Sequence, residues 1–172
     1  MNTIWTIGHS THPLADFIKI LQSFKIEVIV DIRSFPGSNK FPQYNKEAFK
    51  LSLAGMSINY IHLPILGGRR KVIADSKNTA WKNASFRGYA YYMHTESFKE
   101  GIIELEHIVF EKLTAYMCSE AVWWRCHRSM VSDYLKVGNW RVMHIMAIDK
   151  AQEHPFTQPA KIINGKLNYE KE

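Results

Sequence analysis

The feature that most constrains the fold is an alternation of short apolar, strand-like runs with segments of helical periodicity. Residues 3–7 form a β-rich run, and Pro13 then opens a pattern of apolar residues at helical spacing. The continuous run Val28-Ile29-Val30 is typical of a strand that is covered on both faces. Further strand-like runs lie at residues 58–63, 113–118 and 141–146.

Helical segments separate these runs. Asn45 and Thr95 are suitable caps for two of them, and a third follows Arg128. Connections of this length allow neighbouring strands to be parallel. We therefore predict an α/β fold with a mostly parallel central sheet of about five strands and helices on both faces, in a Rossmann-like three-layer arrangement. We expect residues 1–172 to form one domain, with a C-terminal hairpin or arm from about residue 151.

Composition restricts the class of protein. The 172 residues are 46% hydrophobic and 22% charged, which excludes a wholly disordered chain. No apolar run is long enough for a membrane span, and the first ten residues lack the pattern of a secretory signal. With two cysteines and no export signal, we expect a cytoplasmic protein with free thiols. The net charge of +6 favours anionic partners, such as a small anionic molecule, a nucleotide-like ligand or nucleic acid.

The segment from Tyr116 to Arg128 concentrates the chemistry of the chain, because it holds both cysteines, a carboxylate, a histidine and two arginines. It follows a strand-like run and precedes a helical one, the position at which open α/β sheets bind ligands. Cys126, beside His127 and Arg128, is the candidate nucleophile, since positive charge and a helix N-terminus stabilise a thiolate. Cys118, at the end of the strand, could instead be a small buried hydrophobic residue.

Other side chains at the ends of the expected strands complete the candidate site. Glu120, His9 and His127 are candidate acids or bases, although Glu120 could instead pair with a nearby arginine. The guanidinium groups of Arg33 and Arg128 fit a phosphate or carboxylate, and Asp31 could orient one of them. If the strands are parallel, all of these loops open at one edge of the sheet.

Metal binding is not predicted. A zinc site can be drawn from Cys118, Cys126, His127 and His9, but the chain has no paired CxxC or HExxH spacing. No pattern in the sequence predicts a particular cofactor.

Several of these segments together resemble the DUF488 family, a domain of unknown function. The resemblance rests on the segments Thr6–Ser10, Asp31–Ser38, Leu66–Gly68, Phe86–Ala90, Met117–Glu120, Trp124–Arg128 and Val142–Ile145. Ser119 stands where alanine is common in the family, and Trp123 where proline is common. The resemblance implies an α/β domain without an assigned reaction, and it carries the motif positions over to His9, Ser10, Asp31, Arg33, Ser38, Gly67, Gly68, Cys118, Glu120, Cys126, His127 and Arg128.

The leading hypothesis is an enzyme that acts on a phosphate-bearing or nucleotide-like ligand. The catalytic candidates are Glu120, Cys126, His127 and His9, and the ligand-binding candidates are Ser10, Asp31, Arg33, Ser38, Gly67, Gly68, Cys118 and Arg128. Two alternatives stay open: a nucleic-acid-binding module that uses the basic excess, and a thiol redox sensor that joins Cys118 to Cys126. The sequence predicts neither the reaction nor the oligomeric state.

Overall fold

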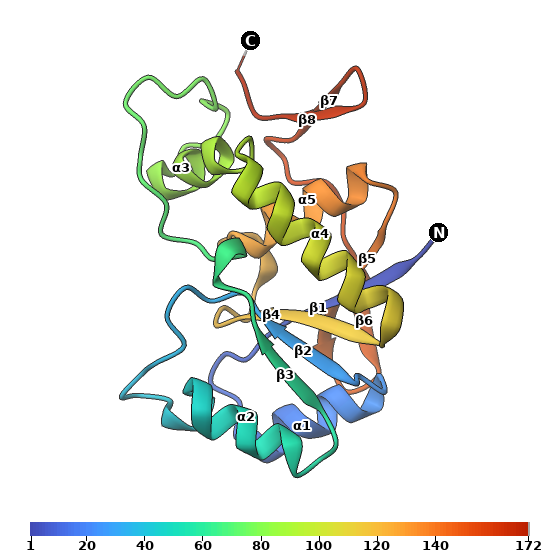
Figure 1. The fold of residues 1–172 in the computed structure, drawn as a ribbon. Helices are drawn as coiled ribbons and strands as arrows, with labels where there is room; N and C mark the ends of the chain where they lie inside the picture. Colours follow the sequence, from blue (N-terminus) through green and yellow to red (C-terminus); the bar gives the residue numbers. More distant parts are fainter. Residues whose placement is uncertain (172) are drawn as a thin grey trace.

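The computed structural model describes residues 1–171 and has an α/β fold (Figure 1). Its strands are β1 (Thr3–Gly8), β2 (Val28–Asp31), β3 (Asn59–His62), β4 (Thr114–Cys118), β5 (Arg141–Ala147), β6 (Lys150–Glu153), β7 (Lys161–Ile163) and β8 (Lys166–Asn168). Its α-helices are α1 (Leu14–Ser23), α2 (Lys46–Ala54), α3 (Ala84–Tyr92), α4 (Glu96–Glu111) and α5 (Arg128–Val137). Three short 3-10 helices are η1 (Pro42–Tyr44), η2 (Pro64–Leu66) and η3 (Trp123–Arg125).

The central sheet has six strands in the order β3-β2-β4-β1-β5-β6. Strands β1 to β5 are parallel to their neighbours, and β6 pairs antiparallel with β5 at the edge. The predicted mostly parallel α/β sheet is therefore confirmed, with one strand more than expected. The sequence Lys-Ala-Gln-Glu of β6 has no apolar run, and such a polar edge strand has no hydrophobic pattern to detect.

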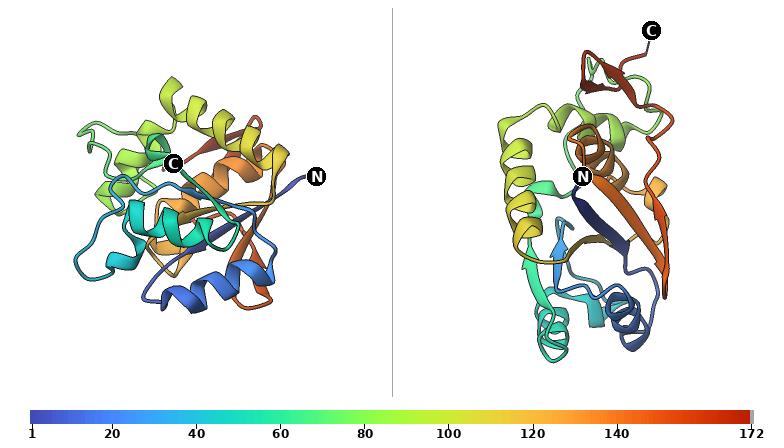
Figure 2. Two further views of the ribbon diagram at one scale, coloured as in Figure 1. Left: turned by 60° about the horizontal axis from the view of Figure 1, so that its bottom comes forward. Right: turned by 90° about the vertical axis from the view of Figure 1, so that its right-hand side faces the viewer.

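Helices cover both faces of the sheet (Figure 2). On one face α1 and α2 pack through Phe17, Leu21 and Phe49 against a layer that includes Ile29. On the other face α3, α4 and α5 pack against a layer that includes Val28 and Val30. Because side chains alternate along a strand, the unbroken Val28–Val30 run supplies apolar groups to both layers.

The two predicted helix caps differ in what their side chains do. Thr95 accepts a hydrogen bond from the Phe98 N–H at 3.3 Å and caps α4 as predicted. Asn45 also stands at the cap position of α2, but its side chain makes no capping bond. Its Oδ1 instead accepts a hydrogen bond of 2.6 Å from the Ser38 N–H, so Asn45 holds the loop that follows β2.

A buried carboxylate ties the C-terminal segment to α5. Asp133 accepts hydrogen bonds from His154 Nε2 at 2.9 Å, from the Thr157 N–H at 2.9 Å and from the Tyr169 hydroxyl at 2.7 Å. His154 Nδ1 lies 2.8 Å from Nε2 of His144 on β5. We call these five residues the Asp133 cluster. Beyond it, the turn at Asn164 and Gly165, both with positive φ, joins β7 to β8 in a separate two-stranded sheet.

The parallel strands bring the loops that follow β1, β2, β3 and β4 to one edge of the sheet. Gly8 is aligned with Cys118, and Asp31 is aligned with both Met117 and His62. The loops after β2 and β3 extend to the same side of the molecule (Figure 1). Among residues 1–171, no helix is long and apolar enough to cross a membrane.

Candidate functional site

The two cysteines of the chain meet at the carboxyl end of β4. Cys118 is the last residue of that strand, and Cys126 lies between η3 and α5. Both thiols are free and buried, and their Sγ atoms are 2.8 Å apart. The strand-to-helix turn that the sequence predicted therefore folds back on itself and brings the two sulfurs into contact.

Arg128, the first residue of α5, supplies positive charge to the sulfurs. Its Nε donates to Cys118 Sγ at 3.2 Å, and its Nη1 donates to Thr6 Oγ1 at 3.1 Å. Its Nη2 donates to the Glu120 carbonyl at 2.9 Å. The side chain is 1% exposed, so these contacts occupy the guanidinium inside the protein. We call Cys118, Cys126, His127 and Arg128 the thiol cluster.

The surroundings of the two sulfurs favour a thiolate on Cys118. Burial favours its neutral thiol, but the hydrogen bond with Cys126, the charge of Arg128 and a backbone hydrogen bond at Glu120 outweigh burial and lower its pKa from 9.0 to about 6. Burial and the neighbouring Cys118 both raise the pKa of Cys126 well above its ordinary value. Cys126 thus keeps its proton and donates a hydrogen bond to the Cys118 thiolate.

Backbone packing fixes the turn that carries these sulfurs. The His9 N–H donates to the Cys118 carbonyl at 3.1 Å, and the Ser10 N–H donates to the Ser119 carbonyl at 2.9 Å. A Cβ atom on Gly8 would lie only 1.6 Å from the Glu120 carbonyl oxygen. Only glycine fits at position 8, and Ser10, the predicted ligand-binding residue, contributes a backbone contact here.

Asp31 orients Arg33, as the sequence suggested for one of the arginines. Arg33 Nε donates to Asp31 Oδ1 at 2.9 Å, and Nη2 donates to Oδ2 at 2.7 Å. The Tyr60 hydroxyl also donates to Asp31. This bidentate pair offsets the charge of Arg33 and fixes the direction of its remaining Nη1 group.

His9 completes this group as a neutral imidazole. Arg33 Nη1 donates to His9 Nε2 at 3.2 Å, so His9 Nδ1 carries the proton and donates to the Ser10 carbonyl at 2.9 Å. The ring stacks on Tyr44 with a centroid distance of 4.1 Å. Burial is the main reason that the pKa of His9 falls from 6.5 to about 4. At neutral pH His9 therefore adds no charge to the site.

His127 contacts Cys126 at the cavity wall. Its Nδ1 is 3.5 Å from Cys126 Sγ, and its ring packs closely against Gly68. Burial, followed by the charge of Arg128, lowers the pKa of His127 to about 4. It is therefore also neutral at physiological pH.

These groups surround a cavity of about 640 Å³ at the carboxyl edge of the sheet. Its lining residues are His9, Arg33, Ser34, Phe35, Gly37, Ser38, Phe41, Gly68, Arg69, Ser85, Phe86, Tyr89, Cys118, Ser119, Glu120, Arg125, Cys126 and His127. This volume is in the range of pockets that hold small-molecule ligands.

Eight of the twelve candidate residues line this cavity: His9, Arg33, Ser38, Gly68, Cys118, Glu120, Cys126 and His127. Ser10, Asp31, Gly67 and Arg128 lie outside its lining. Asp31 and Arg128 each form a hydrogen bond with a side chain that lines the cavity, Arg33 and Cys118 respectively. Gly67 permits close packing, because a Cβ there would lie 2.4 Å from Ser34 Oγ.

The sequence missed the aromatic wall of the cavity and its outer arginines. Phe35, Phe41 and Phe86 line it, together with Arg69 and Arg125. They come from the loops after β2 and β3, from α3 and from η3, and no spacing rule connects them. Phe35, Phe86 and Arg125 lie inside the segments that resemble the family, but no role was predicted for them. Within residues 1–171, no three histidine, cysteine or acidic side chains are placed to hold a metal ion together.

The fold and the site define an α/β protein with a paired-thiol centre at the carboxyl edge of a parallel sheet. Residues 13–135 match the family described as Domain of unknown function DUF488, which is more than half of the chain. The chain belongs to this family. No curated protein and no solved structure matches the chain in the same comparisons.

Proposed function

We propose that this protein is an enzyme that binds a phosphate-bearing or nucleotide-like ligand in the cavity and uses Cys118 as its nucleophile. The observation that carries the proposal is the contact of Cys118 Sγ with both Cys126 Sγ and Arg128 Nε at the cavity wall. Enzymes activate a cysteine by lowering its pKa with a nearby cation or hydrogen-bond donor.

This assignment differs from the sequence hypothesis in the choice of sulfur. The position of Cys126 before Arg128 favours it as the nucleophile, but the Arg128 side chain turns toward Cys118. Cys126 then serves as a hydrogen-bond donor to the thiolate. Arg128 likewise acts on the sulfur and leaves ligand binding mainly to Arg69 and Arg125, which line the cavity, because Asp31 offsets the charge of Arg33.

The chemistry consistent with this arrangement is displacement at an electrophilic centre of the ligand. Cys118 Sγ forms the new bond with its electron pair, and the bond to the leaving group breaks. Among the described residues, Glu120 is the only acid in the lining, and its carboxylate acts as the general base for a water molecule that cleaves the new bond to Cys118 Sγ. This second step releases the product and restores the thiolate, while the leaving group takes its proton from solvent. His9 and His127 are neutral and so add no positive charge to the cationic wall.

The test combines ligand screening with thiol chemistry. Thermal unfolding is measured with nucleoside monophosphates, nucleoside triphosphates and sugar phosphates, for wild type, Cys118→Ser and Glu120→Gln. A true ligand at a hundredfold excess over its Kd stabilises wild type by about 2.7 kcal/mol, or about 5 to 10 °C. Turnover of that ligand is then measured, and it should disappear in Cys118→Ser and fall in Glu120→Gln. Glu104→Gln, an exposed acid on α4, is the matched control.

Two results would contradict the enzyme proposal. One is the absence of any ligand that stabilises wild type. The other is full turnover in Cys118→Ser.

The distance between the sulfurs favours a second candidate function, the thiol redox sensor. A peroxide would convert the Cys118 thiolate to a sulfenic acid with release of water, and Cys126 would then displace a second water to form the disulfide. Mass spectrometry after peroxide treatment should show a loss of two hydrogens in wild type and none in Cys126→Ser. Stepwise over-oxidation of Cys118 in wild type, without disulfide, would exclude this function.

A further inference from the structure

We propose that the ligand of the cavity is a nucleotide within a single-stranded nucleic acid, whose neighbouring nucleotides bind to the mouth of the cavity. This inference rests on the proposed function and deepens it by naming the substrate as a polymer. The observation behind it is a set of aromatic and cationic side chains paired along the mouth.

The loop after β2 carries two of these pairs. Phe35 is 72% exposed, and the Arg69 guanidinium lies 5.6 Å from its ring centroid. Lys40 Nζ lies 5.5 Å from the ring centroid of Phe41 in the same loop. An exposed aromatic ring offers a stacking face to any base, and an adjacent cation attracts the phosphate beside it.

On η3, an exposed aromatic residue and a cation are neighbours in the sequence. Arg125 lines the cavity, and the preceding Trp124 is 50% exposed. Neither Arg69 nor Arg125 forms a salt bridge within the described part of the chain. Both charges are thus available to an anionic ligand, unlike the charge of Arg33.

The loop after β3 is built to hold Arg69 in position. The neighbouring Arg70 donates to the backbone carbonyls of Gly67 and Ile65 and stacks on Tyr92 at 3.7 Å. Arg69 itself has a φ of 59°, a left-handed conformation that a non-glycine residue adopts at an energetic cost. Such strain is common in functional loops, and here it directs a cation to the cavity mouth.

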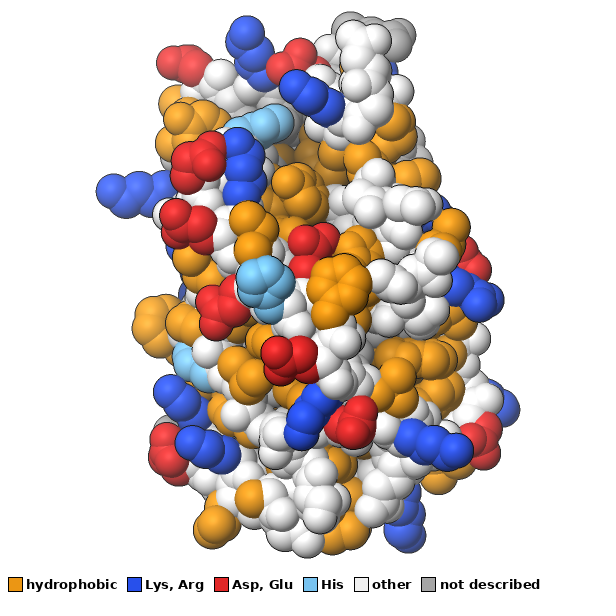
Figure 3. All heavy atoms as spheres, turned by 45° about the vertical axis from the view of Figure 1, so that its right-hand side comes forward, with side chains coloured by type: hydrophobic (Ala, Val, Ile, Leu, Met, Phe, Trp, Pro, Cys, Tyr) orange, Lys and Arg blue, Asp and Glu red, His pale blue; other side chains and the backbone are white. Residues whose placement is uncertain are grey.

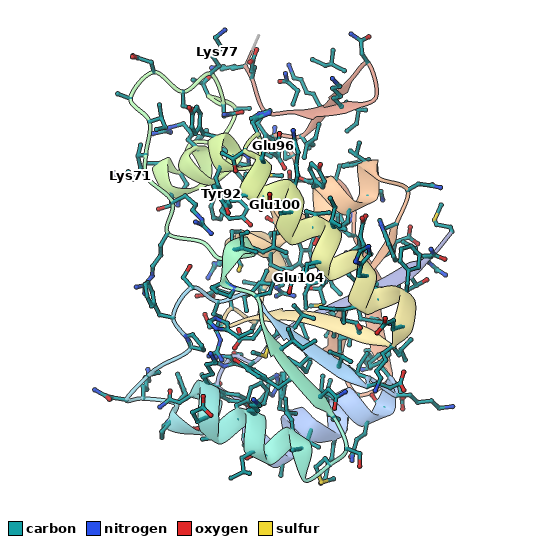
Figure 4. All side chains as sticks on the ribbon, in the orientation of Figure 1. Lys71, Lys77, Tyr92, Glu96, Glu100 and Glu104 are labelled. Atoms are coloured by element: carbon teal, nitrogen blue, oxygen red, sulfur yellow. The ribbon has the colours of Figure 1, made fainter. Side chains whose placement is uncertain are left out.

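Acidic side chains lie along the outer side of α4, away from the cavity lining. Glu96, Glu100 and Glu104 follow one another along α4 (Figure 4). The face shown in Figure 3 mixes acidic and basic side chains without a cationic stripe. At the cavity, by contrast, the lining holds three arginines and only one acid, Glu120.

These observations favour a polymer over a free nucleotide. A single nucleotide bound in the cavity would leave the half-exposed ring of Trp124, which is not part of the lining, without a base to stack on. A single strand would place one nucleotide near Cys118 and stack its neighbours on the rim. A duplex keeps its bases paired and stacked, so it could not use these rings.

The experiment measures binding of fluorescently labelled dT12, rU12 and a 12-base-pair duplex by anisotropy, between 50 and 300 mM salt. We expect both single strands to bind more tightly than the duplex and more tightly than a mononucleotide competitor. Tighter binding of one single strand would distinguish RNA from DNA as the natural substrate.

Two sets of variants separate stacking from charge. Phe35→Ala with Phe41→Ala should weaken single-strand binding by about tenfold or more without changing its salt dependence. Arg69→Gln with Arg125→Gln should make the slope of log K against log salt shallower by about 1.4, or about 0.7 for each phosphate contact. The controls are Phe110→Ala, an exposed ring on α4, and Lys150→Gln on β6, which should change neither quantity.

Equal binding of duplex and single strand would overturn the inference, as would identical losses in the control variants. Binding of mononucleotides alone, with no effect of the Phe35 and Phe41 changes, would overturn the polymer but leave the proposed enzyme standing. If neither nucleotides nor sugar phosphates bind, the proposed function fails as well.

Discussion

The thiol cluster and the Asp133 cluster both hold histidines among other titratable side chains, and they differ in their access to a cavity. In the thiol cluster, Cys118 and His127 line a cavity of about 640 Å³. In the Asp133 cluster, Asp133, His144 and His154 are all 0% exposed and bond mainly to one another. Residue type alone therefore does not identify a site, because the same groups can bind a ligand or join two parts of a fold.

The two clusters are connected through one side chain. Trp123 on η3 stacks on His144 with a centroid distance of 4.6 Å and an angle of 5° between the rings. The chain then passes through Trp124 and Arg125 to Cys126. The Asp133 cluster thereby supports the turn that carries the two cysteines.

The largest effect on the free energy of unfolding is expected in the Asp133 cluster. Asp133→Ala removes the acceptor shared by His154, Thr157 and Tyr169 and leaves their donors buried without a partner. We expect a loss of about 3 to 5 kcal/mol in the free energy of unfolding, measured with urea. Asp75→Ala, at an exposed position, should change it by less than about 0.5 kcal/mol. A loss below about 1 kcal/mol in Asp133→Ala would show that the cluster is not structural.

Acid should weaken both clusters through their histidines. Burial lowers the pKa of His9 and His127 to about 4 and that of His144 to about 2. The unfolded chain gains these protons near pH 6.5, but the folded chain resists them, so stability is present above pH 6.5 and is lost as the pH falls toward 4.

The contribution of His127 to this pH dependence of stability can be measured separately. For His127 the lowered pKa corresponds to a loss on the order of 3 kcal/mol between pH 6.5 and 4. His127→Gln should flatten the measured pH dependence of unfolding by that amount. An identical pH dependence in wild type and variant would show that His127 titrates normally in the folded state.

Two glycines of the site region provide a matched pair of substitutions. Gly8→Ala would place a Cβ 1.6 Å from the Glu120 carbonyl oxygen, whereas a Cβ on Gly37 meets nothing within 4 Å. We expect Gly8→Ala to lower stability by about 2 to 3 kcal/mol and to disturb thiol reactivity, since the backbone must shift. Gly37→Ala should leave both unchanged. If the two variants unfold alike in urea, the close approach at Gly8 is not required.

The smallest effect is expected at Asn45. Asn45→Ala removes the acceptor for the Ser38 N–H and loosens the loop that carries Phe35 and Phe41. The expected loss is about 0.5 to 1.5 kcal/mol. Hydrogen exchange at Ser38 should accelerate, while α2 keeps its protection. Loss of protection in α2 instead would mean that Asn45 caps the helix.

Patterns that depend on neighbouring residues could be predicted from the sequence, and contacts between distant segments could not. The alternating apolar runs predicted the parallel sheet, and Thr95 predicted the start of α4. The aromatic residues of α3 have modest helix propensity, so that helix carried no clear signal. Eight of the twelve candidate residues line one cavity at the strand ends, as the parallel topology predicts, and their role as a functional site stays a prediction.

The roles of the individual site residues could not be predicted from the sequence, because they depend on the direction in which each side chain points. Arg128 could have faced a ligand, and only its contact with Thr6, 122 positions earlier in the chain, shows that it turns inward to Cys118. Together with the hydrogen bond from Cys126, this orientation of Arg128 lowers the pKa of Cys118, whereas the sequence favoured Cys126 as the activated thiol.

The most direct test of this account is the pH dependence of Cys118 alkylation by iodoacetamide, followed by mass spectrometry in wild type and in Arg128→Gln. A thiolate above the lowered pKa predicts that the wild-type rate rises through about pH 6 and levels off near neutrality. In Arg128→Gln the midpoint should move toward the ordinary value of 9.0, with at least a tenfold lower rate at pH 7. A wild-type midpoint near 9, or Cys126 reacting before Cys118, would contradict the assignment of Cys118 as the activated thiol.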